Sequence, residues 1–265
     1  MKIFQIIDRE TGEMPGILLY AEKDKAFIVE LLEDLDEWTA PLLFSGFVKK
    51  GIYTIPRDIS LAWIRERIIP SGRQNISDIL ANQKMKEYDE LRFLELSEGR
   101  CSQDSLYLKR VDEIPEYVKE RQRHNLTGVF PTAGNSMICF FADGVVKKVD
   151  LEKLSDVEGA DKPLKNRELF ESGKVGFAGY FVTFDDSIDI PAVALYEAGE
   201  TLPLTKEDFV AFVQKNLLDT SEACGLLECS RQNLAYLCGQ NRLAPIKEGA
   251  SGNLYLKEDL LRTRW

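Results

Sequence analysis

The order of hydrophobic and polar positions divides the first 124 residues into strands followed by helices. Residues 1–8 alternate as a half-buried strand does, and residues 16–22 follow as its partner after a turn. Over residues 25–35, apolar residues recur at helical spacing, which predicts a helix. Three shorter helices are predicted from Asp58, over 75–83 and over 87–99. Strands followed by helices indicate a small α+β unit.

The middle of the chain alternates between short strands and short helices. An apolar strand is predicted at 137–141, with a hairpin turn at Asp143-Gly144 and a return strand at 145–151. A helix at 168–172, a strand at 180–184 and a helix starting at Pro191 follow. This pattern predicts a second small α+β domain.

The last sixty residues have a helical pattern with strong boundary signals. An amphipathic helix is predicted at 206–217. Asp219 and Glu222 form a capping-box pattern for the next helix, and Ser230 is a predicted N-cap for a helix over 231–238 that ends at Gly239. Two helices joined by so short a turn are typical of a helix-turn-helix. Two strands around a turn at 249–252 would form a wing, and residues from 257 onward a last helix.

Composition agrees with a folded chain of several domains. The 265 residues are 44% hydrophobic and 29% charged, which is enough apolar material for packed cores. We therefore expect the α+β class, with two small α+β domains at 1–124 and 125–205, followed by an all-helical or winged helix-turn-helix domain at 206–265. Trp38 and Trp63 are expected in the core, and Lys119, Arg121 and Arg123 on a solvated helix face.

Several functional classes lack their signals in this sequence. No apolar run of membrane-spanning length and no signal peptide is recognisable, so we expect a cytoplasmic protein without membrane contact. Five cysteines at irregular spacings and a single histidine indicate neither a disulfide framework nor a zinc site. The common catalytic motifs are missing, which favours a protein that is not an enzyme and has no cofactor or metal.

The second helix of the C-terminal pair carries side chains suited to reading DNA. Arg pairs with guanine and Asn or Gln with adenine in the major groove, which the first turn of such a helix enters. The net charge is −10, but residues 216–265 hold six basic and six acidic residues and are neutral. A protein-interaction or dimer module remains the alternative. The candidate DNA-contacting residues are Ser230, Arg231, Gln232, Asn233, Tyr236, Arg242, Lys247, Asn253 and Tyr255.

The acidic run Asp185, Asp186 and Asp189 has two interpretations. Three carboxylates in one loop can bind a divalent cation or a partner protein. The favoured alternative is a turn in which Asp side chains bond nearby backbone amides before the helix that starts at Pro191.

Three parts of the chain resemble known families. The run from Ile69 to Asp104 resembles the N-terminal subdomain of HipA-type toxin kinases, without any counterpart of the kinase body. The motifs Asp143-Gly144, Leu169-Phe170 and 188–190, followed by Leu-Tyr-Glu at 195–197, resemble the domain-of-unknown-function family 2442. That resemblance implies a small α+β domain, often found beside helix-turn-helix domains and in some cases in toxin–antitoxin systems.

The C-terminal segment resembles the excisionase and MerR-like winged helix-turn-helix family. Departures from the family pattern are Cys224 and Gly225 in the first helix. The resemblance implies a DNA-binding winged domain. The matching positions are Thr220-Ser221-Glu222-Ala223, Leu226-Leu227, Ser230-Arg231-Gln232-Asn233, Leu243-Ala244-Pro245 and Asp259-Leu260.

Together these features predict a sequence-specific transcriptional regulator of the antitoxin or mobile-element type. It would bind double-stranded promoter or operator DNA as a homodimer, and its front domains would bind a toxin or another protein. The first alternative is a protein-binding inhibitor, such as a phage or plasmid anti-CRISPR protein, whose acidic middle segment blocks a nucleic-acid enzyme. A second is an enzyme that uses the carboxylates of Asp185–Asp189.

Overall fold

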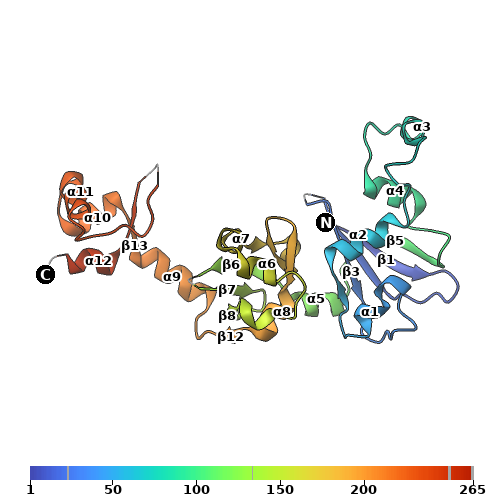
Figure 1. The fold of residues 1–265 in the computed structure, drawn as a ribbon, viewed down its shortest axis with the longest axis horizontal. Helices are drawn as coiled ribbons and strands as arrows, with labels where there is room; N and C mark the ends of the chain where they lie inside the picture. Colours follow the sequence, from blue (N-terminus) through green and yellow to red (C-terminus); the bar gives the residue numbers. More distant parts are fainter. Residues whose placement is uncertain (23, 133, 250–251, 264–265) are drawn as a thin grey trace.

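The computed structural model describes residues 1–22, 24–132, 134–249 and 252–263. It is a mixed α+β fold with several small antiparallel sheets, which confirms the expected class. The chain runs along the longest axis of the molecule, from the N-terminal sheet through the middle sheets to the C-terminal helices (Figure 1). In the part of the chain described, no helix has the length and apolar character needed to cross a bilayer.

A five-stranded antiparallel sheet forms the N-terminal unit, with strand order β4-β3-β2-β1-β5. Helices α2 and α4 pack on one of its faces, where Trp63 and Phe44 are buried with their ring centroids 5.5 Å apart. The strands are β1 (Lys2–Asp8), β2 (Gly16–Ala21), β3 (Ala26–Leu31), β4 (Thr54–Ile55) and β5 (Leu106–Val111). The helices are η1 (Leu42–Phe44), α1 (Ser45–Val48), α2 (Arg57–Arg65), α3 (Ile76–Asn82) and α4 (Glu90–Ser97).

The helix predicted over 25–35 is wrong, because residues Ala26–Leu31 form strand β3. This strand pairs with β2 on one side and β4 on the other, and all six of its residues are buried. A strand covered on both faces loses the alternation of apolar and polar residues, so its apolar run resembles a helix. Trp38 is also not in the core, since it is 85% exposed, whereas Trp63 is buried as expected.

The middle unit contains a four-stranded and a three-stranded antiparallel sheet around a second core. The predicted strands and the Asp143-Gly144 hairpin are confirmed, and Pro191 immediately precedes the expected helix. The strands are β6 (Leu126–Pro131), β7 (Ser136–Phe141), β8 (Val146–Asp150), β9 (Lys174–Val175), β10 (Phe181–Phe184), β11 (Ile188–Pro191) and β12 (Glu200–Thr201). The helices are η2 (Leu151–Leu154), α6 (Asp161–Lys165), α7 (Arg167–Glu171), η3 (Phe177–Gly179) and α8 (Ala192–Ala198).

Helix α5 (Glu116–Gln122) joins the N-terminal sheet to the middle unit. Val118 packs in one buried cluster with Ile28 of β3 and with Tyr180 and Phe181 of the middle unit. Arg121 is not on a solvated face as expected. It is ion-paired with the fully buried Glu30 of β3, at 2.5 Å between Nη1 and Oε2.

The C-terminal unit begins after helix α9 (Lys206–Asn216), which leads away from the middle sheets (Figure 1). It contains β13 (Leu217–Asp219), α10 (Thr220–Leu227), α11 (Arg231–Gly239), β14 (Leu254–Leu256) and α12 (Lys257–Arg262). Because β13 and β14 pair as a small antiparallel sheet, this end of the chain is not all-helical. Its core is a cluster formed mainly by Ala223, Leu234, Leu243, Tyr255 and Leu260.

Candidate nucleic-acid interface

Helix α10 begins where the sequence predicts it. The carboxylate of Asp219 accepts hydrogen bonds from the backbone N–H groups of Ser221 and Glu222, at 2.7 and 2.9 Å. The side chain of Glu222 accepts in return from the N–H of Asp219 at 2.9 Å. This reciprocal capping box satisfies donors that the first helical turn leaves free, and so fixes the start of the helix.

Three residues connect α10 to α11. Glu228 has the left-handed backbone conformation at φ 52°, which ends α10, and the N–H of Cys229 bonds the carbonyl of Cys224 at 3.0 Å. Ser230 then caps α11, its hydroxyl accepting from the N–H of Asn233 at 3.2 Å. A turn this short sets the angle between the two helices through local bonds.

The buried sides of the two helices meet in the C-terminal core. Ala223 of α10 and Leu234 of α11 are fully buried, and Leu226, Leu227 and Leu237 pack partly against them. The small side chain of Ala223 lets α10 and α11 approach closely, as expected for the predicted helix-turn-helix. Gly225 lies on the solvent side with open space around it, so the departure there leaves the packing unchanged.

The opposite side of α11 is polar and open to solvent. Arg231, Gln232 and Asn233 are all exposed in its first turn, and Tyr236 is 62% exposed one turn later. Arg231 donates a hydrogen bond from Nη2 to the hydroxyl of Ser221 at 2.9 Å, which ties its guanidinium to the start of α10. The first turn of α11 therefore presents one guanidinium and two amides together.

The expected wing is present only in part. Strand β14 pairs with β13 rather than with residues 242–247, and those residues contribute one isolated bridge between Lys247 and Leu254. Lys247 is exposed beside this bridge, and Arg242 is exposed near the end of α12. The tip of the expected wing turn, residues 250–251, lies outside the described residues.

Two of the nine candidate side chains do not face solvent. Tyr255 is 3% exposed and packs in the core, with its hydroxyl 3.9 Å from the sulfur of Cys238. Asn253 is half-buried and donates from its amide to the hydroxyl of Tyr255 at 3.5 Å. Strand alternation explains both placements, because Tyr255 points to the face of β14 that covers the helices. We leave these two side chains out of the candidate interface.

The acidic run in the middle unit spans a hairpin turn and the start of β11, and two of its three carboxylates have cationic partners. Asp185 and Asp186 occupy the left-handed region, at φ 50° and 54°, between β10 and β11. Asp186 pairs with Lys174 at 2.9 Å, and Asp189 with Arg57 of the N-terminal unit at 2.9 Å. Burial raises the pKa of Asp189 above its ordinary value, against the opposing effects of Thr183 and Arg57. In the described part of the chain, no group of side chains is arranged to hold a metal ion.

Comparison with known proteins adds no relative. No family model, curated protein or solved structure matches the chain. The three resemblances drawn from sequence motifs therefore stay predictions.

Proposed function

We propose that the protein is a sequence-specific DNA-binding regulator whose C-terminal unit is a winged helix-turn-helix. One observation carries this proposal, namely that the first turn of α11 is fixed by its cap and its core contacts while Arg231, Gln232 and Asn233 remain exposed. This turn is the part of a recognition helix that enters the major groove, and these side chains match the edges of guanine and adenine.

The remaining candidate cations would contact phosphates beside the groove. Lys247 lies next to the short bridge of the wing and Arg242 follows α11, so both are placed outside the base-reading turn. One such unit covers only a half-site, so we propose that the protein binds as a homodimer on a two-fold related operator. In this proposal it acts in the cytoplasm, without a cofactor and without catalysis.

The charge of the middle unit bears on the alternative proposal, a protein-binding inhibitor. A surface that imitates nucleic acid needs unbalanced negative charge. In the middle unit, ion pairs join Lys153 to Glu200, Lys165 to Asp161, Arg167 to Glu171, Lys174 to Asp186 and Arg57 to Asp189. These pairs use five carboxylates, and the unit keeps an excess of Asp and Glu over Lys and Arg, so an inhibitor that acts through this unit stays the alternative proposal.

The test is a salt titration of binding to the DNA upstream of the protein's own gene. We expect R231A/N233A to weaken specific binding at least about tenfold, because each bidentate base contact contributes about 1–3 kcal/mol. The variant K206A/Q214A removes one cation and one amide from exposed positions of α9 and is the matched control. It should bind as the wild type does.

The salt dependence separates specific from general attraction. Specific binding should fall steeply with salt, since phosphate contacts release counterions. Equal affinity for operator and random DNA at low salt, or equal losses in R231A/N233A and K206A/Q214A, would contradict the proposal.

A further inference from the structure

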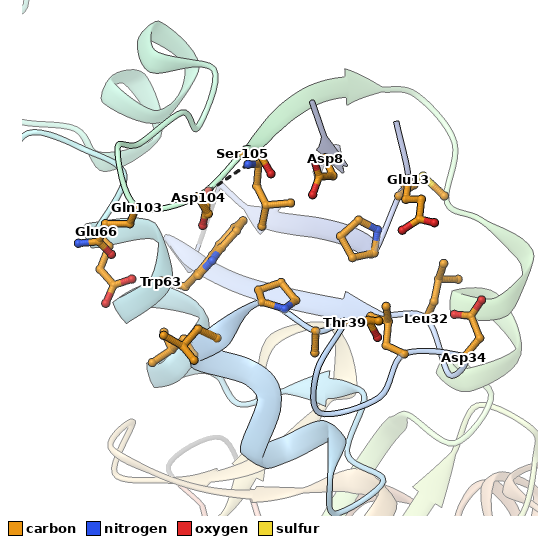
Figure 2. Close-up of a pocket in the computed structure, with 18 residues that line it drawn as sticks. Asp8, Glu13, Leu32, Asp34, Thr39, Trp63, Glu66, Gln103, Asp104 and Ser105 are labelled. Atoms are coloured by element: carbon orange, nitrogen blue, oxygen red, sulfur yellow. Dashed lines mark hydrogen bonds between the residues drawn. The ribbon is translucent and has the colours of Figure 1, made fainter. Parts of the chain in front are cut away.

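A groove of about 910 Å³ opens at one end of the N-terminal sheet (Figure 2). Its walls come from the end of β1, the residues just before β2, those just after β3 and those before β5. The segment 32–43 forms a further side, and Trp63 and Glu66 come from the region of α2. Nothing in the proposed DNA-binding function uses this groove.

The apolar side of the groove is held rigidly and faces solvent. In η1, Phe44 is fully buried against Trp63, while Leu42 is 91% exposed and Leu43 is 36% exposed at the groove. Trp38, 85% exposed, lies in the same segment. Large apolar side chains that protrude from an anchored segment are typical of a contact surface for another protein.

Local bonds fix the turn that carries Trp38. The carboxylate of Asp36 accepts from the backbone N–H groups of Trp38 and Thr39, both at 2.8 Å. Glu37 pairs with Lys49 of the segment that follows η1, at 2.6 Å. The exposed indole is therefore part of an ordered turn, and binding a partner there costs little conformational entropy.

Acidic side chains surround the apolar surface. Asp8, Glu13 and Asp34 lie around one end of the groove and Glu66 lies at the other (Figure 2). None of these four carboxylates has a Lys or Arg within ion-pair distance among the residues described, unlike Asp104, which pairs with Arg67. Burial acts to raise the pKa of Asp8, but hydrogen bonds from the N–H groups of Glu10 and Thr11 outweigh it and lower the pKa. The rim therefore presents four carboxyl groups, none of them ion-paired with a cation among the residues described.

We propose that this groove binds a cationic, apolar segment of a partner protein. The apolar side chains of the segment would lie against Leu42, Leu43 and the lining residues Met14 and Pro15, with its Lys or Arg residues opposite the four rim carboxylates. Nucleic acid is repelled by such a rim, and a second copy of this chain, itself at −10, is a poor electrostatic match.

The experiment measures fluorescence anisotropy with labelled peptides and the full-length protein. The probe is an amphipathic peptide of Lys, Leu and Phe. One companion peptide has Ser in place of Leu and Phe, and a second has Glu in place of Lys. We expect the first peptide alone to bind tightly, because it alone satisfies both the apolar side and the acidic rim. The charge-reversal variant E13K/D34K should raise its Kd at least about tenfold, or about 1.4 kcal/mol.

The matched control is D156K/E158K, which changes the net charge equally at exposed positions of the middle unit. Its Kd should stay within about twofold of the wild type, as expected for distant exposed charges under screening. The second groove variant, L42S/L43S, should weaken binding without a change in charge. Circular dichroism of each variant checks that the fold is retained, and both groove variants should bind operator DNA as the wild type does.

Two outcomes would overturn the proposal. Equal losses in E13K/D34K and D156K/E158K would show general attraction to an acidic protein rather than a site. Self-association of the wild type that L42S/L43S abolishes, measured by sedimentation, would assign the surface to a second copy of the chain.

Discussion

The N-terminal sheet and the middle unit share a buried joint, whereas the middle unit and the C-terminal unit are joined by an exposed helix. At the first joint, Ile28, Val118, Tyr180 and Phe181 form one apolar cluster. Gln122 donates to the hydroxyl of Tyr180 at 2.8 Å, and the guanidinium of Arg57 lies 5.1 Å from the ring centroid of Phe181. The two front units therefore form one body.

The second joint has little buried surface. No residue of α9 is fully buried, and Val210 and Phe212 are 42% and 52% exposed. Phe209 of α9 contacts the middle unit, with its ring centroid 5.7 Å from that of Phe140 and 6.0 Å from that of Phe130. A small interface of this kind permits relative motion, so the C-terminal unit can rotate relative to the body formed by the N-terminal sheet and the middle unit.

The first prediction breaks the buried joint. Arg121→Ala leaves the carboxylate of Glu30 buried without its cation, and we expect a loss of about 3–5 kcal/mol in the free energy of unfolding. Urea unfolding followed by far-ultraviolet circular dichroism measures it. Arg123→Ala is the control, since that side chain is 62% exposed and pairs with the exposed Glu120. A similar small effect in both variants would mean that the Glu30–Arg121 pair does not hold the joint.

The second prediction tests the exposed connection through α9 between the middle unit and the C-terminal unit. Leu234→Ala removes a fully buried side chain from the small C-terminal core and should cost about 2–4 kcal/mol there. If the two regions are energetically separate, hydrogen exchange should accelerate in α10, α11 and α12 and stay unchanged in β1 to β3. Acceleration across the whole chain would show that the C-terminal unit unfolds together with the front body.

Sequence signals worked where local chemistry decides the structure. The capping box of Asp219 and Glu222, the N-cap at Ser230 and the hairpin at Asp143-Gly144 all form as predicted, because each depends on residues within one turn. The exposed first turn of α11 follows from the same signals. This is the part of the candidate site that sequence reasoning could reach.

The failures come from tertiary contacts. The sequence of strand β3 predicts a helix, because both faces of the strand are covered and its apolar run is continuous. The sequence also predicts that Tyr255 lies on the wing, whereas β14 places its side chain in the core. The sequence does not predict the acidic groove, because its four rim carboxylates are far apart in the sequence and come together only in the folded sheet. The sequence signal closest to the groove is the cluster of apolar residues around Trp38. Such a cluster has the same sequence pattern whether its side chains are buried or exposed.

The third prediction tests Glu30, at the buried joint between the N-terminal sheet and the middle unit, by changing the pH. Desolvation raises the pKa of Glu30 above its ordinary value of 4.5, against the pull of Arg121. The folded state then holds this proton at pH values where the unfolded chain has released it, so the contribution of Glu30 to stability falls as pH rises above 4.5. Glu30→Gln removes this contribution. Unfolding free energies between about pH 4 and pH 7 should therefore show the variant gaining on the wild type as pH rises. A constant difference would contradict the assignment.

The last prediction makes the same small change in both regions. Ser230 caps α11 and Asn166 caps α7, each through one bond of 3.2 Å to a backbone N–H. Replacing either by Ala should cost about 1 kcal/mol, equal to a roughly fivefold rise in exchange through the opening that the cap controls. In Ser230→Ala the faster hydrogen exchange should extend over α10, α11 and α12, because these helices share one small core. In Asn166→Ala it should stay within the N-terminal sheet and the middle unit. Operator binding by Ser230→Ala should weaken by no more than the same factor if the hydroxyl only caps the helix. A larger loss would place Ser230 itself against the DNA, and a rise confined to α11 would show that the C-terminal helices do not open as one unit.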